Sequence, residues 1–462
     1  MTSRTARTPL LAFLLAASAA AATACGSTGS EQGEVGEQLG EPGGGEAQDD
    51  HELTSGTVTT GSQPQPQSGV RPGGRADAKG NSGGDIAPAN DGVPGEAPAA
   101  SAPPVVPGAP PSLERQVTAK LGLGGNFLVG LGNDASGAGA GQTHTYELSK
   151  KLDIHYMYLS GVDWPEWNLP AGNYVTLQAN AAKARGIVPM FTLYQAAAYG
   201  ENNLGAFNTN DFMTKYWRGV RLMLQHLAAF DSPAIVHVEP DLWGYTQKKS
   251  GLPSGVPMKV GTLVPECTDL PSDVAGMARC VIRLSRQIAP KVVVGLSAST
   301  FGAFTNGYSD PARIGSYMKS IGADQGDITV LETLDRDAGC FENASDVNCK
   351  RAGKFYWDEA NVAHPNFHDH LAWAKTIRNV IGKPLLWWQM PLGVPANTAG
   401  WAGNYRDNRV RYLFSHAGEF AAAGGIGAVF GTGAPNQTNA KTDGGQFAAA
   451  VTGYYAAPAA LP

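Results

Sequence analysis

The sequence predicts an α/β fold, a (β/α)8 barrel of the TIM type, over residues 112–462. Eight short apolar runs alternate with stretches whose apolar residues have helical spacing. About 350 residues is also the length that such a barrel needs once insertions are allowed. A doubly wound open sheet is the alternative. It requires a Gly-x-Gly-x-x-Gly motif after the first strand, whereas Gly130, Gly132 and Gly137 have a different spacing.

The expected strands follow the apolar runs, and breakers set their limits. Pro233 precedes the fourth run and Pro240 ends it, because proline cannot donate to a strand ladder. The eight strands are predicted at 126–132, 154–160, 187–195, 234–239, 291–297, 327–334, 385–390 and 426–430.

Helices are expected between these strands, with capping residues at several ends. Asn210 and Asp211 are typical N-terminal capping residues for the longest helix, and Gly186 and Gly382 are typical stops. The predicted helices are 143–152, 174–185, 212–230, 272–288, 311–321, 364–381, 407–423 and 447–455. Long loops are expected after Tyr245 and after Asp337. The second is too long for a plain connection, and loops of that length are often functional.

The first 24 residues have the order of a secretory signal. Arg4 and Arg7 precede the apolar run 10–22, which is too short to span a membrane. Small residues then precede Cys25. This order resembles the bacterial lipoprotein signal, which implies cleavage before Cys25 and lipidation of that cysteine. Ala22 replaces the usual leucine, and ordinary cleavage that releases a secreted protein is the alternative.

Residues 25–111 are rich in Gly, Pro, Ser, Ala, Glu and Gln and contain almost no aromatic residues. Such a segment cannot bury a core, and its composition predicts a disordered tether. Attachment by lipid alone is therefore expected, with the folded domain held away from the membrane and facing the periplasm or the cell exterior.

Cysteine use and charge fit an exported protein that does not bind nucleic acid. The four later cysteines are expected to form the sequence-local pairs Cys267 with Cys280 and Cys340 with Cys349, the simplest of three possible connectivities. Their spacing does not indicate a zinc site. The net charge of −6 and the pI near 5.9 offer no basic surface for nucleic acid.

The fourth run ends in two acids, Glu239 and Asp241, at the carboxyl end of a buried parallel strand. Residues that line one face of a strand alternate, so His237, Glu239 and Asp241 are predicted to share a side. An acid at this position loses hydration, which costs free energy. We therefore expect it to have a hydrogen-bond or charge partner, or a functional role. A capped turn with a solvated Asp241 is the structural alternative.

Glu332 is the expected partner of this pair. The same alternation places Ile328, Val330 and Glu332 on one side of the sixth strand. Two carboxylates are what glycosidic cleavage requires, one to protonate the leaving oxygen and one to act on the anomeric carbon or on water. The alternative is a loop network in which Arg336 neutralises the neighbouring acids.

Other strand ends carry amides, acids and aromatic rings that suit sugar hydroxyls and the flat face of a sugar ring. The candidate substrate-binding residues are Asp163, Trp164, Tyr194, Gln195, Trp243, Asp335, Trp388 and Gln389. Neither a metal nor another cofactor is expected. His155 and His237 are interpreted as core histidines, and no Gly-x-Ser-x-Gly motif supports a serine nucleophile.

With this architecture the chain resembles the broad superfamily of (β/α)8 glycoside hydrolases. The common retaining families place their acid/base glutamate after strand four, which implies that role for Glu239. They place the nucleophile at the end of strand seven, where this chain has Gln389, so that role is not carried over. The run Glu239-Pro240-Asp241 is similar to the Glu-Pro-Asp signature of the inverting family 6 cellulases, in which the Asp is important near the reaction centre.

The sequence thus predicts an exported, surface-tethered glycoside hydrolase, with Glu239 as general acid and Glu332 or Asp241 as base or nucleophile. The rival is a non-catalytic carbohydrate-binding or cell-surface interaction protein on a degenerate barrel, which Gln389 favours. A polysaccharide lyase or deacetylase would need a Lys or Arg beside a Tyr, or a metal triad, and neither is evident.

Overall fold

The computed structural model describes residues 110–132, 144–305, 308–344, 349, 353–396, 405–434 and 437–462. The predicted signal peptide, Cys25 and almost all of the predicted tether lie outside these residues. Among the described helices, none is long and apolar enough to cross a membrane.

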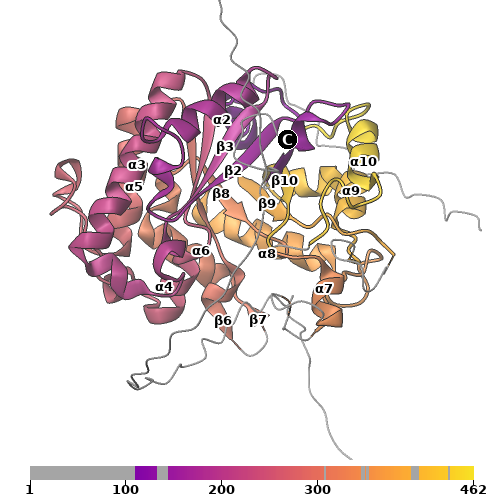
Figure 1. Cartoon of the computed structure of the whole chain (residues 1–462). Helices are drawn as coiled ribbons and strands as arrows, with labels where there is room; N and C mark the ends of the chain where they lie inside the picture. Colours follow the sequence, from indigo (N-terminus) through magenta and orange to yellow (C-terminus); the bar gives the residue numbers. More distant parts are fainter. Residues whose placement is uncertain are drawn as a thin grey trace, which may run out of the picture. The chain divides into compact units, whose positions relative to one another are not determined.

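Eight parallel strands form a closed barrel in the order β1-β10-β9-β8-β5-β4-β3-β2, which confirms the predicted fold (Figure 1). Strands that are consecutive in this set pair with each other, and β1 closes the barrel by pairing with β10. The strands are β1 Leu128–Gly132, β2 Ile154–Ser160, β3 Val188–Tyr194, β4 Ala234–Val238, β5 Val292–Ser297, β8 Ile328–Leu331, β9 Leu385–Met390 and β10 Gly425–Gly431.

Helices surround the barrel, as amphipathic crossovers between parallel strands require. They are α2 Asn173–Lys183, α3 Asn210–Phe230, α4 Leu242–Ser250, α5 Val274–Ile288, α6 Pro311–Ile321, α7 Ala338–Asn343, α8 Phe367–Ile381, α9 Arg409–Ala422 and α10 Gln446–Tyr454. A short antiparallel pair, β6 Phe304–Thr305 with β7 Tyr308–Ser309, lies before α6. The predicted helix 143–152 is instead a single 3-10 turn, His144–Tyr146, within its described part.

Capping residues fix where the longer helices begin. Thr209 accepts a hydrogen bond from the N–H of Phe212 at the start of α3, and Asp310 accepts two at the start of α6. Asn366 does the same for α8, three residues later than predicted. These caps fix the first residue of each helix, and so fix which face of the helix packs against the barrel.

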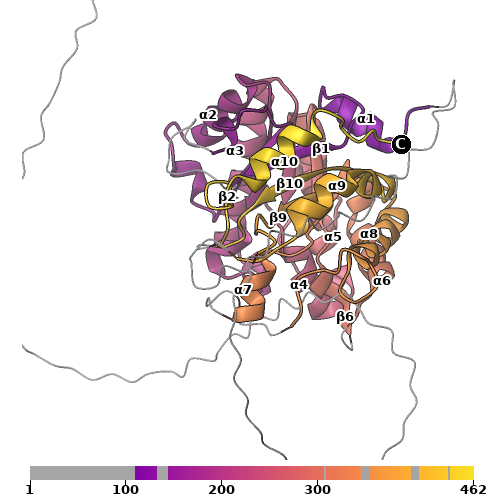
Figure 2. The same cartoon turned by 90° about the vertical axis from the view of Figure 1, so that its right-hand side faces the viewer.

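Helix α1, Leu113–Lys120, closes the N-terminal end of the barrel and was not predicted. Its Val117 belongs to the same buried cluster as Leu128 and Ile154, which begin β1 and β2. Arg115 donates to the carbonyl oxygens of Leu461 and Pro462, so the first and last segments of the domain are joined there. Figure 2 shows α1 beside the C-terminus. One barrel end is therefore sealed, which leaves the C-terminal strand ends for a site.

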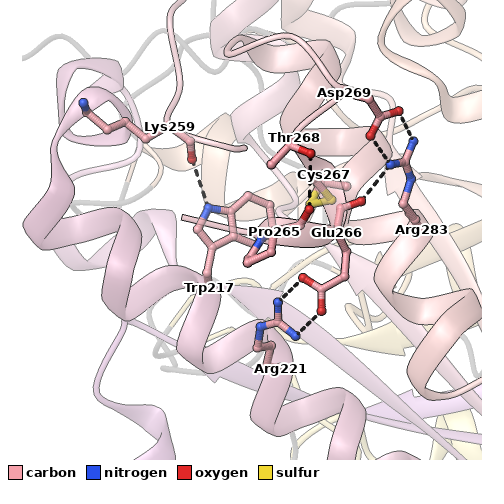
Figure 3. Close-up of a disulfide and its surroundings, with 10 residues drawn as sticks. Trp217, Arg221, Lys259, Pro265, Glu266, Cys267, Thr268, Asp269 and Arg283 are labelled. Carbon is pink, nitrogen blue, oxygen red and sulfur yellow. Dashed lines mark hydrogen bonds and ion pairs between the residues drawn. A yellow bond between two sulfur atoms is a disulfide. The ribbon is translucent and has the colours of Figure 1, made fainter. Parts of the chain in front are cut away.

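Both predicted disulfides are present, Cys267–Cys280 and Cys340–Cys349. The first joins the long segment after α4 to α5 (Figure 3). Ion pairs on either side of Cys267 hold the same segment, from Glu266 to Arg221 of α3 and from Asp269 to Arg283 of α5. This segment is therefore fixed to the outer helices.

Candidate active site

A cavity of about 100 Å³ lies at the C-terminal end of the barrel strands. Seven of the eight strands, or the loops directly after them, contribute to its wall, which is where (β/α)8 enzymes place their sites. The lining residues are Tyr158, Tyr194, Glu201, Pro240, Asp241, Ser297, Ala298, Ser299, Thr300, Phe301, Glu332, Asp335, Arg336, Trp388, Gln389 and Gly433.

Asp241 and Glu332 both line this cavity, and both interact electrostatically with the phenol of Tyr158. Burial, Tyr156 and the charges of Glu332 and Asp241 raise the pKa of Tyr158 well above its usual value. Tyr158 therefore keeps its proton at neutral pH and stays a hydrogen-bond donor, within electrostatic reach of two carboxylates. The structure thus brings together two of the three predicted catalytic residues.

Glu201 is a third carboxylate in the wall, and sequence reasoning missed it. The Tyr194 hydroxyl donates to its Oε1 atom, and the Tyr245 hydroxyl donates to its Oε2 atom at 3.4 Å. Glu201 belongs to an irregular segment between β3 and α3, so neither strand alternation nor a motif marks it. Tyr194, predicted to bind substrate, lines the cavity and holds this acid.

Two consecutive residues of β9, Trp388 and Gln389, line the cavity because the strand bulges there. The pairing of β9 with β10 shifts register across this point, and Gln389 has a φ of 55°. Trp388 packs edge to face against Tyr158, with ring centroids 5.8 Å apart, and against His237 at 4.7 Å. Its indole N–H has no hydrogen-bond partner among the described residues.

Asp335, Arg336 and Gly433 form the wall next to Gln389. Asp335 and Arg336 are ion-paired with each other. A Cβ atom on Gly433 would lie 1.8 Å from the carbonyl oxygen of Asp335 and 3.1 Å from the Gln389 Nε2 atom. Only glycine allows these three loops to approach so closely.

Glu239, the predicted general acid, does not line the cavity. Its φ of 50° breaks the strand alternation, and its fully buried carboxyl accepts hydrogen bonds from the N–H groups of Gln195 and Ala196 at 3.0 and 3.2 Å. Residues before a proline rarely adopt a positive φ. Of the three residues expected to share a side, His237 faces Trp388 and Asp241 lines the cavity, while Glu239 lies behind the wall.

Burial raises the pKa of Glu239 from 4.5 to about 8. Such a carboxyl stabilises the fold most below its unfolded pKa, and this contribution is lost as the pH rises toward 8. Between pH 5 and pH 8, we expect the melting temperature of the parent protein to fall more than that of Glu239→Gln. The difference between the two falls should be about 2 °C or more. Thermal melts at a series of pH values test this, with the exposed Glu166→Gln as control. Parallel curves for the parent and Glu239→Gln would contradict it.

Four predicted substrate-binding residues lie outside the cavity wall. Trp164, Gln195 and Trp243 are fully buried; the Trp243 indole N–H donates to the Val238 carbonyl at 2.8 Å, and the Gln195 side chain donates to the Tyr216 carbonyl. Asp163 is exposed and precedes a 3-10 turn. These contacts give Trp243 and Gln195 structural roles at the β4 and β3 ends, and Trp164 belongs to the main hydrophobic core cluster.

No group of three or more metal-ligating side chains occurs within the described ranges. His237 is buried, its pKa is lowered to about 3 by that burial, and its Nδ1 atom lies 3.3 Å from the Thr192 hydroxyl. His155 is also buried and contacts the Tyr146 hydroxyl at 3.0 Å. Both histidines are thus buried residues of the barrel strands, each within hydrogen-bond distance of a hydroxyl group.

No family model and no curated protein sequence matches the chain. Solved structures that resemble it include the family 26 domain of an endo-β-mannanase/endo-β-glucanase from Prevotella bryantii (10% identity, 73% of this chain and 93% of that chain, TM-score 0.43). An endo-β-1,4-mannanase from Cellulomonas fimi has 13% identity over 76% and 79%, with a TM-score of 0.43. An endoglucanase from Humicola insolens has 14% identity over 55% and 68%, with a TM-score of 0.31. These likenesses concern the barrel fold alone.

Proposed function

We propose that this protein is a glycoside hydrolase, with Asp241 and Glu332 as its pair of catalytic carboxylates. The observation that carries the proposal is that both acids line one cavity at the C-terminal barrel end and that the charges of both act on the protonated Tyr158. Glycosidic cleavage needs two carboxyl groups facing one bond. This pairing keeps two predicted acids and moves the role of proton donor from Glu239 to Asp241.

Asp241 is proposed as the acid that protonates the leaving oxygen, and Glu332 as the carboxylate that attacks the anomeric carbon or activates water. Tyr158 and the Trp388 indole N–H supply hydrogen-bond donors for sugar hydroxyls, and the rings of Tyr194 and Phe301 offer apolar faces. Glu201 and Asp335 accept hydrogen bonds from further hydroxyls. Each proposed role thus falls on a residue of the cavity wall.

The charge of the wall supports a neutral or amine-bearing glycan. Its described residues include four carboxylates, Glu201, Asp241, Glu332 and Asp335, and one guanidinium, Arg336. Like charges repel strongly in a partly buried site, so a uronic acid polymer would bind poorly.

We expect release of reducing ends from a mannan, a β-glucan or chitosan at least about tenfold faster than from polygalacturonate, one factor of ten corresponding to about 1.4 kcal/mol. A reducing-end assay on these four polymers tests the proposal. Preference for polygalacturonate would contradict the charge argument, and release from none of a broad glycan panel would contradict hydrolysis.

A non-catalytic carbohydrate-binding protein is the second candidate, and Gln389 favours it. Gln389 lines the cavity where an acid would stand in many retaining barrels, and its Nε2 atom donates to the Thr432 carbonyl. Binding of an oligosaccharide without any turnover, with equal affinity in the parent and in Asp241→Asn, would support this candidate over the hydrolase.

We further propose that the protein is exported and held by a lipid on Cys25. The order of charge, apolar run and small residues before Cys25 supports this, as do the two disulfides, which persist in oxidising compartments. Metabolic labelling with a fatty-acid probe, compared between the full chain and Cys25→Ala, tests it. Equal labelling of the two chains would contradict lipidation.

A further inference from the structure

Asp337 is a buried acid directly behind the cavity wall, two residues after Asp335. Its Oδ1 atom accepts the Gly393 N–H at 3.0 Å, and its Oδ2 atom accepts the Thr438 N–H at 2.7 Å. Gly393 belongs to the segment after β9, and Thr438 to the segment after β10. One carboxyl group therefore joins the segments that follow β8, β9 and β10.

A second layer of contacts surrounds this carboxyl group. The N–H of Asp337 donates to Gln437 at 3.1 Å, and the Gln437 amide nitrogen lies 3.3 Å from the Cys340 sulfur. The N–H of Ala338 donates to buried Asp407, which is ion-paired with Arg409 at 2.8 Å. Asp337 thus lies in a hydrogen-bonded network in which most donors are backbone amides.

The same three segments meet in the cavity wall. The close approach of Gly433 to Asp335 and Gln389 depends on the β8, β9 and β10 segments staying in register. The Gln389 side chain adds one direct bond there, to the Thr432 carbonyl at 3.1 Å. One layer below this wall, the Asp337 carboxyl group bonds directly to the β9 and β10 segments, through Gly393 and Thr438.

We propose that Asp337 is a positioning residue of the active site, which holds Asp335, Gln389 and Gly433 in one wall beside Glu332. The expected effect on turnover rests on the proposed function. The connection that Asp337 makes between the three segments does not depend on that function. A displacement of about 1 Å at a reacting group can lower a rate by about a hundredfold. Loosening these segments should therefore reduce turnover without removing a cavity residue.

Asp337→Asn is the sharpest variant. The amide has one acceptor oxygen, so it can accept from only one of Gly393 and Thr438, and its NH2 group then meets the other N–H as a second donor. Burial and the neighbouring Asp407 raise the pKa of Asp337 to about 7, so a neutral side chain of the same shape is compatible with folding. Gln437→Ala is a milder second variant that removes only the acceptor for the Asp337 N–H.

Asp153→Asn is the matched control at the other end of the barrel. Asp153 also accepts a backbone N–H, from Val129 at 3.0 Å, and a hydroxyl, from Tyr455 at 2.6 Å. It precedes β2 and so lies far along the strands from the cavity. A general loss of stability should affect both variants, whereas a local effect on the wall should affect only Asp337→Asn.

Hydrogen–deuterium exchange and steady-state kinetics on the full chain test the inference. We expect amides in 389–396, 432–434 and 437–438 to exchange about tenfold faster in Asp337→Asn, less so in Gln437→Ala, and unchanged in Asp153→Asn. We also expect kcat to fall tenfold or more in Asp337→Asn while KM changes less than threefold. Unchanged exchange in both segments, or equal loss of kcat in Asp153→Asn, would overturn it. A parent chain that hydrolyses no glycan would count against the proposed function, while exchange would still decide the connection.

Discussion

Replacing Asp241 by Asn is expected to lower kcat on a polysaccharide by about 10²- to 10⁴-fold, the range that general acid catalysis contributes. The carboxyl group lines the cavity, and Asn keeps its shape but cannot deliver a proton to the leaving oxygen. In an aryl glycoside made from an acidic phenol, the phenolate can leave without being protonated. We therefore expect Asp241→Asn to lose less than about tenfold on a dinitrophenyl glycoside, measured as phenol release.

Asp211→Asn is the control for this experiment. Asp211 is an exposed acid on α3, paired with Lys215, and no cavity residue contacts it in the described structure. Its variant should match the parent on both substrates. If Asp241→Asn lost the same factor on the polysaccharide and on the dinitrophenyl glycoside, Asp241 would not be the proton donor, and a role in binding or in stabilising charge would replace it.

The barrel could be predicted because its strands carry a strong and local signal. Seven of the eight lie within the predicted ranges, and β10 extends one residue beyond its range at each end, since branched and aromatic residues bounded by Gly and Pro leave few alternatives. Helix α1 was missed because its polar sequence buries only a few residues at the barrel end. Helix α4 was missed because it begins directly after Asp241 and includes Gly244, which contacts Phe301 where a side chain would not fit.

The candidate site could be predicted only in part, because two of its features are not local. Strand alternation placed Asp241 and Glu332 at the barrel mouth, where both line the cavity. It failed at Glu239, since the chain leaves the β4 ladder at Val238 and a positive φ turns the Glu239 side chain toward the N–H groups of Gln195 and Ala196, directly after β3. Glu201 reaches the cavity through bonds to Tyr194 and Tyr245, which only the folded chain brings near it.

Glu332→Ala is expected to lower kcat by about 10³-fold or more on every glycan that the parent cleaves, because the second carboxylate acts in the same transition state. Removing the side chain also leaves room in the cavity for a small anion. We therefore expect sodium azide to restore part of the turnover of a dinitrophenyl glycoside and to yield a glycosyl azide. Its anomeric configuration, read by NMR, should be opposite to that of the substrate.

Asp335→Ala separates the role of Glu332 from a general effect of removing negative charge. Both acids line the cavity after β8, but Asp335 is ion-paired with Arg336, so its loss should change binding more than chemistry. Azide should not rescue Asp335→Ala, because no attacking group is missing there. Rescue of Asp335→Ala in place of Glu332→Ala would transfer the second catalytic role to Asp335. Since a carboxylate that attacks and one that activates water both act on the face opposite the leaving group, the configuration of the parent enzyme's product then distinguishes retention from inversion.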